Sequence, residues 1–274
     1  MHKRSDINKP ILRKEKFSDK ITTRIWLEEP SPDNPYIAQR YLCHGYDLFE
    51  LMRSCTFIEV LYLLFRGELP SKNEARLLET LMIALINPGP RHPATRAAMS
   101  SAVSKTHVSH ILPIAVSCLS GDHLGAGEVE KSMRFIKRSL QADPATLTHS
   151  LLGQNPKPPE GDWHIAPGFG SRFGGVDMLP QKIAESLCDQ GGAGKALQWG
   201  NRFAKNLFNH SVGWLTPGIA AAAFLDLGFH PRSGPGLFQI IASPGLLAHG
   251  LELANQPITA MPFVDNQNYI IERS

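Results

Sequence analysis

A histidine in a glycine-rich loop is the first pattern in this sequence that could do chemistry. The segment reads Gly121-Asp-His-Leu-Gly-Ala-Gly127 and is followed by Glu128. Glycines let a backbone approach a ligand closely, and a histidine near neutral pH can donate a hydrogen bond or exchange a proton. His123 is therefore a candidate catalytic residue. The alternative is a loop histidine that only ties the turn to a neighbouring helix.

A proline-rich turn offers candidates for binding. It reads Pro88-Gly-Pro-Arg-His-Pro93, and another arginine follows close behind. Three prolines in six residues exclude regular helix, and a cationic cluster near a helix N-terminus could bind a carboxylate or a phosphate. Arg91, His92 and Arg96 are therefore candidate substrate-binding residues. The other interpretation is a stiff surface turn with solvated arginines.

The elements that must position these loops read as helices. Apolar residues recur with a spacing of three to four from Leu48 onward, Gly67 is typical of a helix C-cap, and Ser71 with Glu74 matches a capping box. Residues 153–175 are rich in glycine and proline, which predicts an irregular segment. We find no internal repeat and no period-2 strand pattern, so the predicted fold class is all-α. Further helices are expected over residues 97–103, 111–119, 128–140, 179–187, 195–208, 219–227 and 238–253.

Composition limits the function classes. The 274 residues are 42% hydrophobic and can bury a core, and the net charge of +3 is too small to argue for nucleic acid. No apolar run approaches the roughly 20 residues of a membrane span, and residues 1–20 lack the apolar stretch of a secretory signal. A cytoplasmic protein without a membrane or nucleic-acid partner is expected.

The cysteines and the N-terminal basic residues carry weaker signals. Four cysteines are scattered without CxxC spacing, which favours reduced thiols and predicts no metal site. The first twenty residues are rich in lysine and arginine. A solvated tail is the preferred interpretation, and a basic arm for phosphate-bearing partners is the alternative. The cysteines are Cys43, Cys55, Cys118 and Cys188, and the basic residues are Lys3, Arg4, Lys9, Arg13, Lys14, Lys16 and Lys20.

Four segments, in this order, resemble the citrate synthase family, especially its short citryl-CoA lyase-like branch. The first is His44-Gly-Tyr-Asp47 followed by Leu63-Leu-Phe-Arg-Gly-Glu-Leu-Pro70, and the second is the His123 loop with Glu128. The third is Ile165-Ala-Pro-Gly-Phe-Gly-Ser-Arg172. The fourth joins Ala222-Ala-Phe-Leu-Asp-Leu-Gly-Phe229 to Ile241-Ala-Ser-Pro-Gly-Leu-Leu-Ala-His249. Each is short, but their common order over residues 44–252 on a helical background is fairly specific.

The resemblance implies an enzyme that makes or breaks a carbon–carbon bond between an acyl-CoA and a keto acid. His123 then matches the histidine that donates to the thioester oxygen. The second catalytic histidine of the family falls at Ser171. The resemblance also implies coenzyme A or an acyl-CoA as substrate, held by a loop at Pro167, Gly168, Phe169, Gly170 and Arg172, and a keto acid or other small carboxylic acid near Arg91, His92 and Arg96.

The sequence departs from the family at three catalytic positions. The aspartate that should remove the proton falls at Pro217, the arginine that should hold the keto acid falls at Ala242, and a histidine is replaced by Ser171. Proline can take no proton, and serine cannot carry a charge near neutral pH. Two functions therefore stay open: a divergent acyl-CoA enzyme, or a catalytically inactive CoA-binding or partner subunit. An unrelated helical protein is the remaining alternative.

The resemblance also implies domains and assembly. A large helical domain over residues 36–127 and 217–274 would carry a small helical domain at 128–216, after a tail and a short extended segment at 1–35. A homodimer is expected, because the helices at 111–119 and 219–227 are apolar on more than one face and such helices must be buried.

Overall fold

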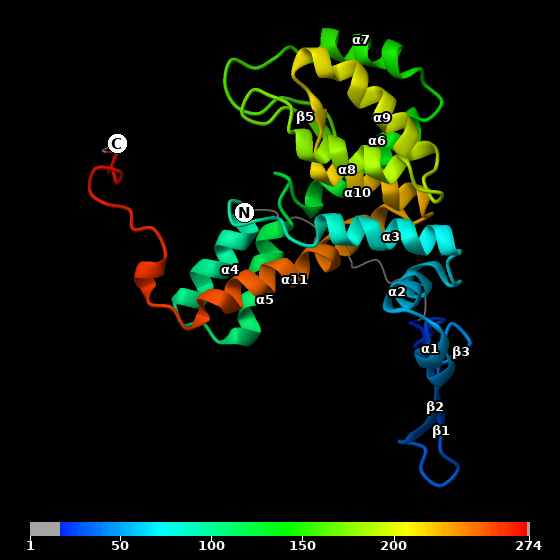
Figure 1. Ribbon diagram of the computed structural model, residues 1–274. Coiled ribbons are helices and arrows are strands. Elements are labelled where there is room, and N and C mark those ends of the chain that lie inside the picture. The colour runs from blue at the N-terminus through cyan, green and yellow to red at the C-terminus, as the bar shows by residue number, and fades with distance from the viewer. Residues whose placement is uncertain (1–16, 273–274) are drawn as a thin grey trace, which may run out of the picture. The chain divides into compact units, whose positions relative to one another are not determined.

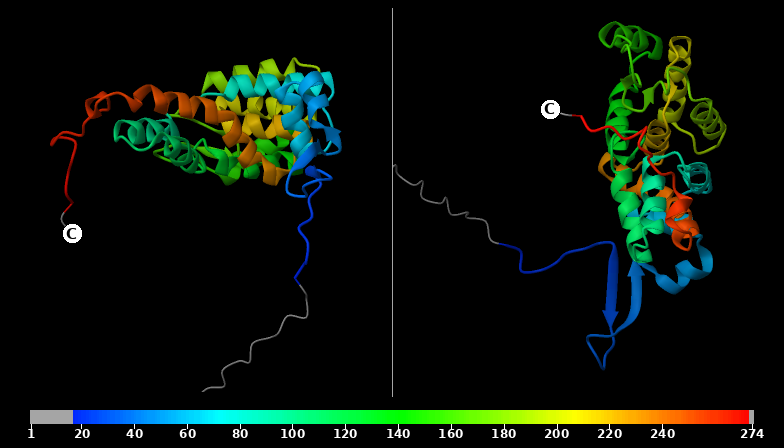
Figure 2. Two further views of the ribbon diagram at one scale, coloured as in Figure 1. Left: turned by 90° about the horizontal axis from the view of Figure 1, so that it is seen from below. Right: turned by 90° about the vertical axis from the view of Figure 1, so that its left-hand side faces the viewer.

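The computed structural model describes residues 17–272 and divides the chain into two compact units, Met1–Cys55 and Thr56–Ser274 (Figures 1 and 2). Of the N-terminal basic residues, those from Lys3 to Lys16 lie outside the described part. The predicted large and small helical domains, which would divide the chain elsewhere, stay a prediction.

The first unit is built on strands. Strands β1 (Trp26–Pro30), β2 (Ala38–Cys43) and β3 (Tyr46–Asp47) form an antiparallel sheet in that order. The tight turn between β2 and β3 uses His44 and Gly45, both at positive φ. Asp47 then caps helix α1 (Leu48–Ser54) by accepting from two backbone N–H groups. The expectation of no strands is wrong here, because strands that bury little of either face need not alternate polar and apolar residues.

The second unit is mainly helical, as predicted. Thr56 and Ser71 each form a complete capping box at the start of a helix, and Gly67 ends the first of these helices at φ 78°. The helices are α2 (Phe57–Arg66), α3 (Lys72–Leu85), α4 (Pro93–Val103), α5 (Val108–Leu119), α6 (Ala126–Ser139), α7 (Pro144–Gln154), α8 (Met178–Cys188), α9 (Lys195–Leu207), α10 (Thr216–Asp226) and α11 (Gly234–Ala254).

Helix α7 and a second small sheet were missed by the sequence analysis. Helix α7 shows little amphipathic periodicity, but Asp143 as N-cap and Pro144 at its first position mark its start. The sheet joins β4 (His164–Ala166), β5 (Phe169–Gly170) and β6 (Gly213–Trp214) in that order. Strands of two or three residues are too short to show a period, so the segment read as irregular.

Helix α11 is the longest helix of this unit and packs against α4, α5 and α6 (Figure 1). Gly250 permits the close approach, since a Cβ there would collide with Ile111 on α5. The segment Pro231–Ala254, with a mean hydropathy of 1.3, is long and apolar enough to cross a membrane by composition alone. The expectation of no such run was therefore too strict, although an inner helix of a folded domain passes the same test.

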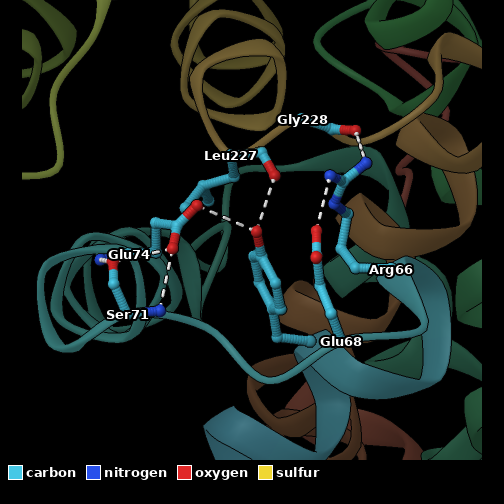
Figure 3. Close-up of polar contacts among 7 residues, drawn as sticks. Arg66, Glu68, Ser71, Glu74, Leu227 and Gly228 are labelled. Atoms are coloured by element: carbon cyan, nitrogen blue, oxygen red, sulfur yellow. Dashed lines mark hydrogen bonds and ion pairs between the residues drawn. The ribbon is translucent and has the colours of Figure 1, made fainter. Parts of the chain in front are cut away.

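A polar network attaches the α2–α3 turn to the C-terminal end of α10 (Figure 3). The Tyr62 hydroxyl lies 3.0 Å from Glu74 Oε1 and 3.2 Å from the Leu227 carbonyl oxygen. Arg66 donates to the Gly228 carbonyl and to Glu68. These donors satisfy carbonyls that a helix end leaves unpaired, and they stabilise α10, whose other end reaches the candidate site.

Asp226 connects the C-terminal end of α10 to the start of α9. Its carboxylate accepts the backbone N–H groups of Gly194, Ala196 and Leu197 at 2.8–2.9 Å. Burial raises the pKa of Asp226, and the three backbone donors oppose that rise. Asp226 is thus a capping residue of the fold.

Candidate functional site

A cavity of about 680 Å³ brings together loops that are far apart in the sequence. The proline-rich turn, the His123 loop and the segment after Gly170 form its walls, together with residues from α8, α10 and α11. This volume lies within the usual range for a small-molecule site. Its ionisable lining side chains are Arg91, His92, His123, Arg172 and Asp177.

His92 is fixed at the start of α4 by its own ring. Nδ1 accepts the Ala94 backbone N–H at 3.1 Å, and Nε2 faces the Leu124 carbonyl oxygen at 3.4 Å. An accepting Nδ1 leaves the proton on Nε2 in the neutral ring. Burial lowers the pKa of His92, and the nearby His123 and Arg172 lower it further. His92 therefore presents a neutral ring at the cavity wall.

Arg172 and Asp177 form the charged pair of this cavity. Arg172 Nη1 lies 3.2 Å from Asp177 Oδ2, while Asp177 Oδ1 accepts the Leu179 backbone N–H and so caps α8. The guanidinium also lies over the Phe173 ring, and its buried Nε has no partner among the described residues. With Arg91 added, the lining has more positive than negative charge, which suits an anionic ligand.

A second cavity of about 570 Å³ is also lined by residues of the His123 loop. His123 is the one described residue that lines both cavities. At the second cavity Lys131 pairs with Asp122 at 2.8 Å. Glu128 is 5% exposed, and its Oε1 accepts the Gly168 N–H at 2.9 Å and lies 3.5 Å from His164 Nδ1. That carboxylate raises the pKa of His164 against the opposing effect of burial.

Backbone hydrogen bonds and one buried side chain hold the loop from Pro167 to Gly170 in place. The Gly168 N–H donates to Glu128, and the Gly168 carbonyl oxygen accepts the Leu215 N–H, each at 2.9 Å. Phe169 is fully buried against Trp214 and Phe203, with ring centroids 4.4 and 4.8 Å apart. Within the loop, only Pro167 lines a cavity, the second one.

Comparison with known proteins concerns the fold. The family of the citrate synthase C-terminal domain matches residues 33–160. The solved structure of citryl-CoA lyase from Hydrogenobacter thermophilus superposes with a TM-score of 0.73 at 24% identity, covering 93% of this chain and 94% of that one. This chain has a citrate synthase-like fold. The predicted resemblance to the citrate synthase family is confirmed, as is the mainly helical fold.

Two larger proteins share the citrate synthase-like fold. ATP citrate lyase from Methanothrix soehngenii, solved with citrate and coenzyme A, gives a TM-score of 0.69 at 15% identity, covering 94% of this chain and 44% of that one. Citrate synthase from Thermoplasma acidophilum was solved with carboxymethyl coenzyme A and oxaloacetate. It gives a TM-score of 0.60 at 17% identity, covering 81% of this chain and 58% of that one. No curated protein matches the chain by sequence.

Two of the three positions predicted to depart from the family pattern lie at or beside the first cavity. Ala242 and Thr216 line the cavity, and the buried Pro217 follows Thr216 at the start of α10. Asp177 is the carboxylate residue of the described lining. It pairs with Arg172 and caps α8. A free carboxylate base is therefore missing from this lining.

Besides Gly168, Phe169 and Gly170, two further candidates from the sequence lie outside both cavity linings. Ser171 is 1% exposed, and its Oγ accepts the Trp163 backbone N–H at 3.1 Å. Arg96 is exposed on α4. Their catalytic and binding roles stay predictions, and the burial of Ser171 does not favour contact with a substrate.

The Glu128–His164 pair was missed as a site. In the sequence, Glu128 was recognised only as the residue that follows the His123 loop. Nothing marked His164 apart from its position next to Ile165. Across residues 17–272, no group of three or more histidine, cysteine, aspartate or glutamate side chains is arranged to hold a metal.

The lowered pKa of His92 predicts a pH-dependent stability. Below its ordinary pKa of about 6.5, His92 takes up a proton in the unfolded chain before the folded one does, so stability falls as pH decreases through that range. In His92→Asn, asparagine keeps the N-cap but does not titrate. Urea unfolding at pH 7.5 and 5.5 should show a larger loss in the wild type than in the variant. Equal losses would contradict this assignment.

Proposed function

We propose that this chain binds an acyl-CoA together with a small carboxylic acid and forms or breaks the carbon–carbon bond beside the thioester. One observation supports it above all: Arg91, His92, His123 and Arg172, from three separate segments, line a single cavity. Arginines bind carboxylates through paired N–H groups, and a neutral histidine can donate to a carbonyl oxygen. The related structures were solved with coenzyme A or its derivative and with citrate or oxaloacetate.

The alternative is a catalytically inactive subunit that binds CoA or a protein partner. The observation that favours it concerns two positions where the resemblance predicts a base and a carboxylate-binding arginine. Ala242 at the second of these lines the cavity, and Pro217 at the first follows the lining residue Thr216. Cytoplasmic location also remains a proposal.

Binding of CoA should depend on the space around Gly168. A Cβ at Gly168 would lie 2.6 Å from the Gly218 Cα and push the loop away from α10, whereas a Cβ at Gly174 meets nothing within 4 Å. Both glycines have positive φ, so both alanine variants carry similar backbone strain. Calorimetry should show Gly168→Ala weakening CoA binding by about tenfold or more, roughly 1.4 kcal/mol, and Gly174→Ala leaving it close to wild type. A wild-type chain that binds neither CoA nor acetyl-CoA would refute the proposal.

Standard citrate synthase activity should be very low. The missing base at Pro217 and the missing arginine at Ala242 should each cost a few kcal/mol of transition-state stabilisation. We expect release of free CoA from acetyl-CoA with oxaloacetate to stay well below about one per second, the low end of ordinary enzymes. His123→Ala is the control. Faster turnover that this variant abolishes would show that oxaloacetate is held by residues other than those expected.

We propose a homodimer that covers α5 and α11. Helix α10 gives no support, because residues 220–224 are fully buried within this chain. Val108 and Ile114 on α5 are exposed. In the segment Pro231–Ala254, which contains α11, only 39% of the most apolar 18-residue stretch is buried. Light scattering should give about twice the chain mass of 30.2 kDa. Ile114→Glu should yield monomers, whereas Ile83→Glu on α3, also at an exposed isoleucine, should not. A wild-type monomer at micromolar concentration would contradict the proposal.

A further inference from the structure

The Glu128–His164 pair is an ionisable group that the proposed function does not yet use. The Glu128 side chain is 6% exposed and that of His164 is 38% exposed, so a buried carboxylate stands behind a ring that reaches the second cavity. Glu128 Oε2 is buried and has no hydrogen-bond partner among the described residues. A buried carboxylate with one oxygen unpaired is costly unless a positive charge or a bound donor lies beside it.

We propose that His164, held by Glu128, is the base that removes a proton from the carbon next to the thioester. This inference rests on the proposed function, because it needs an acyl-CoA whose thioester reaches His123. It assigns to the second cavity the proton transfer that Pro217 cannot perform in the first.

The arrangement leaves one ring nitrogen available. His164 Nδ1 faces Glu128 Oε1, so Nε2 is the nitrogen free to take a proton, and the ring makes no other polar contact among the described residues. A carboxylate behind a histidine fixes the tautomer and stabilises the imidazolium that forms. The other charged or ionisable groups around it are Asp162, which also favours the imidazolium, and His123, Asp122 and Lys131 in the cavity lining. Lys131 is paired with Asp122, which limits its effect on His164.

The first cavity offers no comparable base. The Nδ1 of His92 already accepts the Ala94 N–H, and its Nε2 faces the Leu124 carbonyl. Asp177 is bound to Arg172 and caps α8. Because His123 lines both cavities, a thioester oxygen at His123 would lie at the edge of the second cavity, which His164 also lines.

The step balances without a further reactant. The C–H bond next to the thioester breaks, and the proton passes to His164 Nε2. The electron pair moves into the enolate, whose oxygen accepts a hydrogen bond from His123. The Glu128 carboxylate lies beside the imidazolium and balances its charge. In the direction of bond cleavage, the carbon–carbon bond breaks, its electron pair forms the enolate, and the hydroxyl of the adduct loses its proton to solvent as it becomes the ketone. The enolate carbon then takes a proton from the His164 imidazolium.

The test is exchange of the acetyl-CoA methyl protons for deuterium in D₂O, followed by mass spectrometry. It needs no second substrate. Glutamine at position 164 keeps a polar side chain but cannot accept the proton, so His164→Gln should lower the exchange rate at saturating acetyl-CoA by about 100-fold or more, with calorimetric CoA binding unchanged. His149→Gln is the matched control, since His149 is exposed on α7 outside both cavities.

Glu128→Gln separates a role in positioning from a role in folding. Glutamine keeps an oxygen for the Gly168 N–H but removes the charge behind His164. The exchange rate of the wild type should rise with pH through the pKa of His164. In the variant this midpoint should move to lower pH, because the raising effect of the carboxylate is lost. A purely structural role would change the binding of CoA and leave the midpoint in place.

The outcomes are distinguishable. Exchange at the wild-type rate in His164→Gln, or a change confined to the half-saturating concentration of acetyl-CoA, would overturn this inference. So would a wild-type protein that binds CoA but catalyses no exchange above the buffer rate, although that result would leave CoA binding intact. A wild-type protein that does not bind CoA or acetyl-CoA would instead overturn the proposed function itself.

Discussion

The backbone of Gly168, fixed between α6 and α10, is the constraint on which both cavities depend. Its N–H is held by Glu128 on α6, its carbonyl by Leu215 just before α10, and its Cα faces Gly218 on α10 too closely for any side chain. Glycine alone fits at positive φ in this space. The two hydrogen bonds connect Gly168 to α6 and to the start of α10, so a shift of the loop would move both helices. Residues before the loop then form one wall of the second cavity, and Arg172 after it lines the first.

The helices followed from local signals, and the strands did not. Gly67 and the Ser71–Glu74 capping box depend on hydrogen bonds within a few residues, so the sequence is sufficient to predict them. Strand β6 depends instead on pairing with β5 across more than forty residues, as between Phe169 and Trp214. Strands β4 and β5 are neighbours in the sequence, but each is too short to show a period, so the sequence analysis predicted an irregular segment.

Some features of the candidate site could likewise be predicted from the sequence, and others could not. That His92, His123 and Arg172 line a common cavity could be expected from the order of the motifs, because the resemblance carries a three-dimensional arrangement with it. The burial of Ser171 against the Trp163 N–H could not be expected, since it depends on a hydrogen bond between neighbouring strands. The pairing of Glu128 with His164 was equally hidden, because the two residues lie on α6 and β4.

The two cavities differ in charge, and this difference constrains how one ligand could occupy both. In the first, Arg91 and Arg172 outnumber Asp177, so the charge of its lining favours an anionic ligand. In the second, Lys131 is matched by Asp122 and His164 by Glu128, so its lining has little net positive charge to offer a phosphate. Its walls next to the loop, Ile165 and Ala166, are apolar. A carboxylic acid in the first cavity and the uncharged part of a thioester in the second would then meet at His123, the residue they share, where a developing oxyanion needs its hydrogen bond.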